Sequence, residues 1–401
     1  MEFSEEIDAA EARRQAAFLG ETHSLARVET EHVGHVCKDP VHGWILLNDP
    51  PITDLMATPA FERLWRVQQF GDRWATASLL RCLPHSRAEH SLGTYELIRH
   101  HGPPDRALHI AALLHDAGHT AFSHHGEAVF DDAGQQEWHE SQLERIITQD
   151  RYGVRPVLDS HGISEVEVLA NLAHPLLDRP KPDLCADRLD YILRDGIAAN
   201  FISSETAEDV LAELRVTKGD FQWYFETPWS ADVLERLLAV LETAQYSNPM
   251  MREVKHQTVG LLQHGIDRGY LEEADIAEGT DDSVLEKLWS VRGEDRELDR
   301  LLVDFVELGI PRDATESMGH VMDNFPERFR EFDLPQKRRM IDPLCGNSPE
   351  CGKPGRDLRP LSEWRKEEYD WTKHTGKPIV HLPGHPFMNH EEAKAFQINN
   401  R

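Results

Sequence analysis

"LLHDAGHTAFSHHGE", residues 113–127, places four histidines, one aspartate and one glutamate within fifteen residues, directly after a run of apolar side chains. The apolar run begins near Pro104 and leaves almost no polar face, which predicts a central buried helix. His115 and Asp116 then lie where this helix ends, and we interpret Gly118 as its C-cap. Burying an imidazole beside a carboxylate is unfavourable unless the charge is compensated. A divalent cation would compensate it.

Two other segments supply the further ligands that a metal site at His115 and Asp116 needs. His90, in "HSRAEHSLG", lies about one turn into a predicted helix, on the same face as Arg87. Asp187 lies in "DLCADRLDYILRDG". The order is H…HD…D with spacings of 25 and 71 residues, and imidazole with carboxylate suits ions such as Zn, Mn or Fe.

The chain is predicted to be mostly α-helical, with one small β-hairpin at "LRVTKGDFQWYF" (214–225) and a short strand or hairpin at 38–50. We read "EEADIAEGTDD" (272–282) as a solvated acidic loop. Apolar spacing predicts helices over residues 58–71, 87–101, from about 104 to the HD pair, 139–149, 163–173, 183–195, 205–214, 230–245, 251–269 and 283–308.

Changes in composition suggest three parts of the chain. Residues 1–37 are expected to form a helix and linker, and residues 38–334 the main helical domain. From about residue 335 the sequence becomes rich in proline and glycine without periodicity, so we expect residues 335–401 to form an irregular appendage.

Composition limits the classes of partner. The 401 residues carry 71 acidic and 43 basic side chains, a net charge of −28, which disfavours binding to nucleic acid or anionic membranes. We find no apolar run of membrane-spanning length and no signal peptide. Five scattered cysteines fit a reducing compartment. We therefore expect a cytoplasmic protein.

The order of these motifs resembles that of the HD-domain metal-dependent phosphohydrolases, and in particular the deoxynucleoside triphosphate triphosphohydrolase branch. The similar strings cover roughly residues 38–260 and are "DPVHG", "TPAFERLWRVQQFG", "HSRAEHSLG", "LLHDAGHTAFSH", "DRLDYILRD", "LRVTKGDFQW" and "VKHQT". The resemblance implies a helical HD fold, a nucleotide substrate, a homo-oligomer and one divalent transition metal (Fe, Mn, Zn, Co or Ni), with or without Mg. It implies that the metal ligands are His90, His115, Asp116 and Asp187.

The resemblance also implies roles around the substrate. Three histidines would surround the phosphates and orient water or the leaving oxygen, with Glu127 holding one of them: His119, His124 and His139. Other residues would bind the substrate: Arg87, Arg188 and Tyr191 its phosphates, Asp195 a sugar hydroxyl, and Gln69 the sugar or base edge. Cations lower the pKa of bound water, histidines relay protons and arginines bind phosphate, so the chemistry of these residue types agrees.

The sequence departs from this branch around "QYSNPMMREVKHQT". Aligned on His256, the expected arginine and histidine that hold outer phosphates are Tyr246 and Met250, and the tyrosine that packs on deoxyribose is Val254. The lysine of that helix returns at a different place, as Lys255. The positions of the branch's allosteric guanine-nucleotide site hold other residues (Ala57, Glu62 and Trp65), which predicts no activation of that kind.

Several alternatives remain open from the sequence. His139 with His161 or His174 could complete a two-metal site, and a structural zinc could bind to Cys345, Cys351, His381 and His385. Arg87 could pair with an acidic neighbour, and Tyr191 and Asp195 could simply solvate a helix face. The leading function is hydrolysis of a (deoxy)nucleoside triphosphate. Alternatives are a phosphatase for a nucleoside monophosphate or modified nucleotide, a non-catalytic nucleotide sensor and, more remotely, a di-iron oxygenase.

Overall fold

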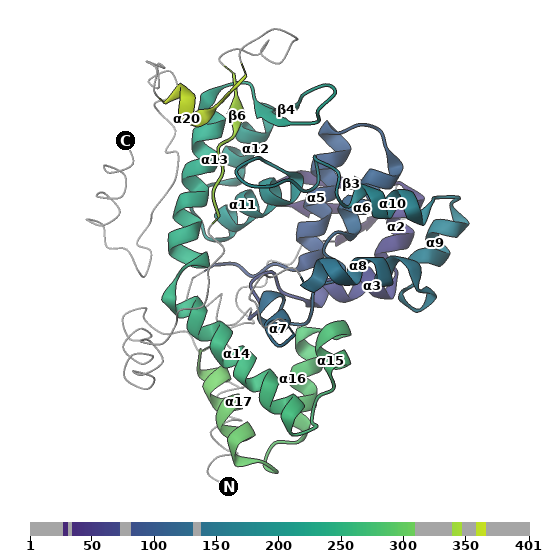
Figure 1. Cartoon of the computed structure of the whole chain (residues 1–401), viewed down its shortest axis with the longest axis vertical. Helices are drawn as coiled ribbons and strands as arrows, with labels where there is room; N and C mark the ends of the chain where they lie inside the picture. The colour runs from purple at the N-terminus through teal and green to yellow at the C-terminus, as the bar shows by residue number, and fades with distance from the viewer. Residues whose placement is uncertain are drawn as a thin grey trace, which may run out of the picture.

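A computed structural model of the chain describes residues 27–30, 34–72, 82–130, 138–308, 339–346 and 358–365 (Figure 1). The fold is mostly α-helical, as predicted. The helices of the described residues are α2 (Pro50–Met56), α3 (Pro59–Glu62), α5 (Arg87–His101), α6 (Arg106–Leu114), α7 (His124–Glu127), α8 (Trp138–Thr148), α9 (Val154–Ser160), α10 (Glu165–Asn171), α11 (Ala186–Ala198), α12 (Ser204–Ala212), α13 (Pro228–Leu241), α14 (Pro249–Asp267), α15 (Glu273–Glu278), α16 (Asp281–Ser290), α17 (Arg296–Leu308) and α20 (Leu361–Trp364).

Helices α5, α6 and α11 form the centre of the molecule (Figure 1). α6 is the predicted buried helix: all its residues from Ala107 to Leu114 except His109 are buried, and Asp105 caps its first turn. α5 begins with a capping box in which Ser86 and Glu89 each bond the other's backbone N–H, which fixes the first turn of this helix. α8 and α10 pack together beside α6, and α2 and α9 are in contact on the same side of the molecule.

A three-stranded antiparallel sheet precedes the helices, in the order β1 (Arg27–Thr30), β2 (Gly34–Asp39) and β3 (Gly43–Leu47). The hairpin expected within residues 38–50 is therefore present, with Asp39 opposite Gly43. The prediction of a helix and linker before residue 38 is wrong for residues 27–30 and 34–37, because these residues form strands. β-branched residues such as Val28 and Val36 favour this pairing.

The predicted hairpin at 214–225 is confirmed as β4 (Leu214–Val216) and β5 (Trp223–Phe225), with Val216 opposite Trp223. The sheet continues through the C-terminal part of the chain. β6 (Leu344–Cys345) pairs in parallel with β5, and β7 (Arg359–Pro360) follows. The boundary expected near residue 335 stays a prediction, but residues 344–345 and 359–360 join the sheet of the helical domain.

Helices α14 to α17 surround a second apolar core (Figure 1). The single helix expected over 283–308 is wrong: α16 ends at Ser290 and α17 begins at Arg296, with Gly293 between them at a φ of +86°. The loop expected at 272–282 is also wrong. It contains α15, whose Ile276 is fully buried, because one apolar side chain per turn is enough to attach a short acidic helix to a core.

Helix α3 ends earlier than predicted. The helix expected over 58–71 begins after Thr58 with Pro59 in the first turn, as foreseen, but continues only as a 3₁₀ helix over Arg63–Arg66. Val67 is extended, and the following residues form a turn that includes Gly71 at a φ of +83°. Among the described residues, no helix combines the length and the apolar character needed to cross a membrane.

Candidate active site

The ends of three helices bring the predicted metal ligands together. Arg87 begins α5, so His90 lies in its first turn, and Asp187 lies in the first turn of α11. α6 ends at Leu114, and His115 is its C-cap. The C-cap interpretation of Gly118 is wrong. This glycine has no positive φ; a Cβ there would lie 2.1 Å from the backbone oxygen of residue 139, so the residue allows close packing instead.

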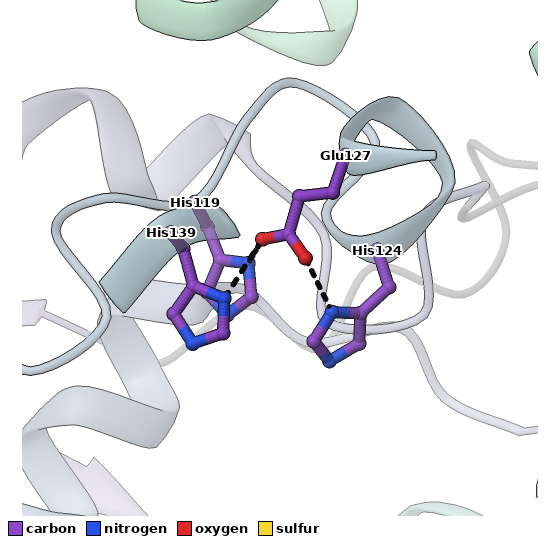
Figure 2. Close-up of side chains that lie close together, drawn as sticks. All are labelled: His119, His124, Glu127 and His139. Atoms are coloured by element: carbon purple, nitrogen blue, oxygen red, sulfur yellow. Dashed lines mark hydrogen bonds and ion pairs between the residues drawn. The ribbon is translucent and has the colours of Figure 1, made fainter. Parts of the chain in front are cut away.

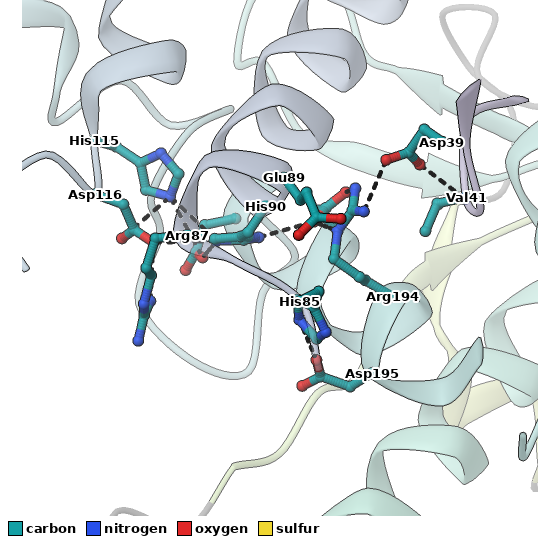
Figure 3. Close-up of polar contacts among 12 residues, drawn as sticks. Asp39, Val41, His85, Arg87, Glu89, His90, His115, Asp116, Arg194 and Asp195 are labelled. Carbon is teal, nitrogen blue, oxygen red and sulfur yellow. Dashed lines mark hydrogen bonds and ion pairs between the residues drawn. The ribbon is translucent and has the colours of Figure 1, made fainter. Parts of the chain in front are cut away.

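Four side chains converge at this point: His90, His115, Asp116 and Asp187. Figure 3 labels the first three of them. The His90 Nε2 atom lies 2.9 Å from Asp187 Oδ1 and 3.3 Å from His115 Nε2. His115 Nε2 lies 3.5 Å from Asp116 Oδ1 and 3.7 Å from Asp187 Oδ1. We call these four residues the metal ligand set.

The geometry of the metal ligand set fits a transition metal ion. The Nδ1 atom of His115 donates to the carbonyl of Ala112 at 2.8 Å, and that of His90 donates to Asp190 at 2.8 Å. Both Nε2 atoms therefore direct a lone pair at the same point. Two nitrogens each ~2.1 Å from an ion, at tetrahedral or octahedral angles, lie ~3.0–3.4 Å apart. The observed separation of 3.3 Å falls in this range.

The electrostatics of the metal ligand set also require a cation. Burial alone would lower the pKa of His90, but hydrogen bonds and charges from Asp187, Asp190 and Asp116 outweigh it and raise the pKa to about 10. Burial alone would raise the pKa of Asp187, but the neighbouring histidines hold it below its usual range. The carboxylates are thus ionised and attract a proton onto His90, and a bound divalent cation would supply that positive charge instead.

Behind His90 lies a buried polar network centred on Asp190, with distances of 2.7 to 3.0 Å. Figure 3 labels its members His90, Arg194 and Asp39. The Asp190 carboxylate accepts from His90 Nδ1, from His42 Nε2 and from two nitrogens of Arg194. A third nitrogen of Arg194 donates to Asp39 at 2.7 Å. Partners of this kind fix the tautomer and orientation of a metal-binding histidine.

The network connects the β2–β3 turn to the metal ligand set. Asp39 Oδ1 accepts the backbone N–H groups of Val41 and His42, at 2.8 and 3.0 Å, so the "DPVHG" turn presents His42 to Asp190. A glycine makes room for it: a Cβ at Gly93 would lie 1.9 Å from Asp190 Oδ1. Sequence reasoning assigned no role to these residues.

We expect Asp190→Asn to weaken metal affinity ~10- to 100-fold, as loss of such a partner usually does. An asparagine keeps the shape but places an NH₂ group against N–H donors, so His90 loses its fixed orientation. The measurement is metal retention against a competing chelator.

Asp232→Asn is the matched control for this prediction. Asp232 is also 2% exposed or less and accepts from an arginine four residues later, Arg236, at 2.6 Å. Each variant removes the charge of a buried carboxylate that is paired with an arginine. Of the two carboxylates, only that of Asp190 is in contact with a metal ligand, His90. Equal metal retention in the two variants would contradict the role assigned to Asp190.

A second cluster lies beside the metal ligand set: His119, His124, Glu127 and His139 (Figure 2). Glu127 Oε1 lies 2.6 Å from His119 Nδ1 and 3.0 Å from His139 Nδ1, and Oε2 lies 2.8 Å from His124 Nδ1. We call this group the His–Glu cluster. His119 Nε2 is also 3.3 Å from Asp116 Oδ1, which links the two groups.

Glu127 fixes the tautomers of the three histidines. Burial alone would raise the pKa of Glu127, but the surrounding imidazoles hold it well below its usual range. An ionised carboxylate only accepts, so each Nδ1 carries the donated proton. Burial lowers the pKa of His124 to about 3, which leaves its Nε2 as a free acceptor. Burial would lower the pKa of His139 too, but Glu127 outweighs burial and raises it.

Both groups border one cavity of about 290 Å³. Of the predicted site residues, His90, His115 and Glu127 lie behind its wall, and the others line it: Gln69, Arg87, Asp116, His119, His124, His139, Asp187, Arg188, Tyr191 and Asp195. The predicted polar stripe of α11 thus faces the cavity. Six basic residues line it in a chain of net charge −28: Arg87, Lys181, Arg188, Arg252, Lys255 and Arg339. Six acidic residues line it as well: Asp116, Glu140, Asp178, Asp187, Asp195 and Glu242. The basic side chains offer cationic partners to an anionic ligand, and a metal ion held by the metal ligand set would offset the carboxylates beside it.

Two of these arginines are held by the protein. Arg87 donates to Asp116 and to the Ser123 hydroxyl, both at 2.9 Å, rather than to Glu89 or Glu127. Arg188 donates to backbone carbonyls before α11, including that of Asp183. Fixed guanidinium groups of this kind are preorganised for phosphate.

The opposite end of the cavity is formed around Asp195. Its carboxylate accepts from the Tyr246 hydroxyl at 2.5 Å and lies 3.1 Å from His85 Nε2. Tyr246 is the last residue of a π-helical turn (Glu242–Tyr246) after α13. Its ring lies against Phe70 and Tyr191, at centroid distances of 6.2 Å each. These aromatic rings form the wall of the cavity at this end.

The Asp281 carboxylate binds the backbone of two loops beside the cavity, at Phe122 and at Gln68. This carboxylate, 7% exposed, accepts the backbone N–H groups of Phe122 at 2.7 Å and of Gln68 at 3.1 Å. Ser123, which receives Arg87, donates in turn to the Gln68 carbonyl at 2.6 Å. Sequence reasoning had placed Asp281 in a solvated loop and missed this contact.

The two alternative metal sites, a two-metal site at His139 and a structural zinc site, have different outcomes. His161 pairs with Asp54 at 2.7 Å and His174 lies against Phe221, so neither joins His139 in a two-metal site. The proposed zinc ligands Cys351, His381 and His385 lie outside the described residues.

Comparison with known proteins agrees with the geometry. Residues 87–195 match the family model of the HD domain, which covers α5 to α11 and every member of the two groups. The chain therefore contains an HD domain.

The similarity to named proteins extends beyond this domain. The chain is 29% identical over 243 residues to the metal-dependent phosphohydrolase cns2 of Cordyceps militaris, covering 59% of this chain and 68% of that protein. It is 34% identical over 172 residues to the uncharacterized protein YdhJ of Bacillus subtilis (43% and 51%). It is 30% identical over 149 residues to the human deoxynucleoside triphosphate triphosphohydrolase SAMHD1 (32% and 23%). The chain thus spans about half or less of the last two proteins.

Proposed function

We propose that this chain is a metal-dependent phosphohydrolase that hydrolyses a nucleotide, with a (deoxy)nucleoside triphosphate as the leading substrate. The observation that carries the proposal is that the metal ligand set and the His–Glu cluster border one cavity, whose lining includes six basic side chains. The HD domain match and the names of the relatives support the same class of reaction.

The metal ligand set would hold one divalent transition metal, which polarises a phosphoryl oxygen and lowers the pKa of bound water. Arg87 and Arg188 bind the phosphate that enters the cavity. His124 orients the attacking water by accepting a hydrogen bond at Nε2, because Glu127 occupies its Nδ1. His139 lies 5.7 Å from His124 between ring centroids and donates a proton to the leaving oxygen.

The test is product analysis. Metal-loaded protein, prepared with each candidate metal with and without Mg, is incubated with nucleoside mono-, di- and triphosphates of each base. Ion-exchange chromatography then separates tripolyphosphate, pyrophosphate and orthophosphate. We expect release of one of these products. Tight nucleotide binding without any product would favour a non-catalytic nucleotide sensor and overturn the proposal that the chain is an enzyme.

A second candidate is a phosphatase for a nucleoside monophosphate or modified nucleotide. This candidate is supported by Tyr246, which replaces the arginine that binds an outer phosphate in the triphosphohydrolases. The Tyr246 hydroxyl donates to Asp195 instead. Release of orthophosphate from monophosphates alone would favour this candidate. The oligomer and the cytoplasmic location stay predictions.

A further inference from the structure

Arg339 reaches the cavity from the part of the chain that the sequence marked as an appendage. Its guanidinium carbon lies 4.2 Å from the centre of the Tyr246 ring, and Nη1 lies 3.9 Å from Glu242 Oε2. The side chain is 23% exposed and lines the cavity. An arginine over an aromatic ring is held by cation–π attraction, so its charge is fixed at the cavity wall.

The segment that follows Arg339 is anchored to the helical domain. Ile341 is buried in the main core, and the backbone N–H of Asp342 donates to the carbonyl of Pro182 at 3.1 Å. Residues 344–345 then form β6 beside β5. These contacts give Arg339 a defined position rather than that of a side chain on a loose tail.

Arg339 makes no hydrogen bond to any described residue, and its nearest carboxylate oxygen is 3.9 Å away. Arg87 and Arg188, on the same cavity, donate to protein oxygens. A guanidinium has five N–H donors, and the partly exposed side chain of Arg339 leaves donors open to the cavity that it lines. An anionic ligand in the cavity would satisfy them.

The position of Arg339 separates it from the metal ligand set. Tyr246, on which it lies, bonds Asp195, and Asp195 is eight residues beyond Asp187 on α11, or ~12 Å along the helix. A group bound by Arg339 is therefore not the phosphate at the metal ligand set. The substrate would carry a second anionic group.

We propose that Arg339 is a substrate-binding residue that recognises an outer phosphate of the nucleotide. The proposal rests on the proposed function of the same cavity. Because Tyr246 and Met250 stand at the positions where the sequence departs from the triphosphohydrolases, Arg339 supplies an outer-phosphate cation from a different part of the chain.

The test compares one nucleoside as its mono- and triphosphate. In Arg339→Ala we expect KM for the triphosphate to rise ~10- to 100-fold, as loss of a charge-assisted hydrogen bond implies, with kcat little changed. KM for the monophosphate should stay within a few-fold. Arg339→Lys should restore part of the loss, because lysine keeps the charge but not the forked geometry.

Arg365→Ala is the matched control. Arg365 belongs to the same part of the chain and pairs with Asp232 and Glu235 on α13, at 2.7 and 2.8 Å, without lining the cavity. Loss of attachment of this segment would affect both variants alike. An unchanged triphosphate KM in Arg339→Ala, an equal rise for both substrates, or the same rise in Arg365→Ala would overturn the proposal.

A binding measurement separates this proposal from the proposed function. Calorimetric titration of the metal-loaded protein with inorganic tripolyphosphate needs no turnover. We expect the wild type to bind this probe ~10- to 100-fold more tightly than Arg339→Ala. Equal affinity overturns the role of Arg339 even if nucleotides are hydrolysed, and absence of turnover by the wild type overturns the proposed function while leaving this comparison intact.

Discussion

Replacing Asp187 with alanine is expected to abolish metal retention and turnover together. Asp187 Oδ1 lies 2.9 Å from His90 Nε2 and 3.7 Å from His115 Nε2, so its loss opens the metal ligand set. Stabilisation of transition-state charge by a metal is worth several kcal/mol, and each ~1.4 kcal/mol is tenfold in rate. We therefore expect turnover to fall on the order of 10³-fold or more.

Asp187 is the best ligand to remove because its side chain is 35% exposed, against 0% for His90 and 5% for Asp116. Its removal leaves no large buried cavity, so the fold should survive, which circular dichroism can check. Asp183→Asn, an exposed carboxylate just before the same helix, is the control and should retain metal. Full activity of Asp187→Ala would refute the ligand assignment.

Glu127→Gln is expected to lower kcat ~10²- to 10⁴-fold, the usual contribution of general acid–base catalysis, without loss of metal. The Glu127 carboxylate lies within 3.0 Å of three Nδ1 atoms, whereas a glutamine side chain carries no charge and its NH₂ group would oppose one of these nitrogens. The Nδ1 atom of His124 then loses the carboxylate acceptor that holds the proton on Nδ1 and keeps Nε2 unprotonated. The measurement is steady-state kinetics with metal content determined on the same sample.

Glu144→Gln provides the comparison for this variant. Glu144 lies on α8, as His139 does, but is exposed and has no part in the His–Glu cluster. We expect it to behave as the wild type. A Glu127→Gln protein with unchanged kcat and intact metal would show that the cluster does not carry protons in the reaction.

The metal ligand set could be predicted from the sequence because its spacing belongs to local elements. His90 lies one turn into a capped helix, and the HD pair ends a helix whose apolar run is visible in the residues themselves. The stripe of Asp187, Tyr191 and Asp195 follows helical periodicity, and all three line the cavity. Chain order alone, however, does not show distances.

The supporting residues could not be predicted because their partners are distant in the chain. Asp190 and Arg194 form an i, i+4 pair, which on most helices is a solvated surface pair of little consequence. Here both are 1% exposed or less, and Asp190 accepts from His90, 100 residues away. Arg339 shows no local pattern, because contacts with distant parts of the chain place it: the Asp342 backbone bond to Pro182 and the pairing of β6 with β5.

Errors in the elements have similar causes. "SVRGED" interrupts an otherwise continuous apolar stripe, and only the positive φ of Gly293 shows that α16 and α17 are separate helices. The acidic segment 272–282 has low hydropathy overall, yet Ile276 and Asp281 are both buried. Average composition over a window cannot reveal that one residue in it packs against a core.

The most direct test of the central claim is a titration of metal-free protein with a divalent transition metal, with release of product from a nucleotide followed at each step. We expect no turnover without metal and, with the metal ligand set rather than the His–Glu cluster as the group that binds the ion, a rise that ends near one ion per chain. Asp187→Ala should show no rise. Turnover by metal-free protein at the rate of the loaded protein would contradict the account.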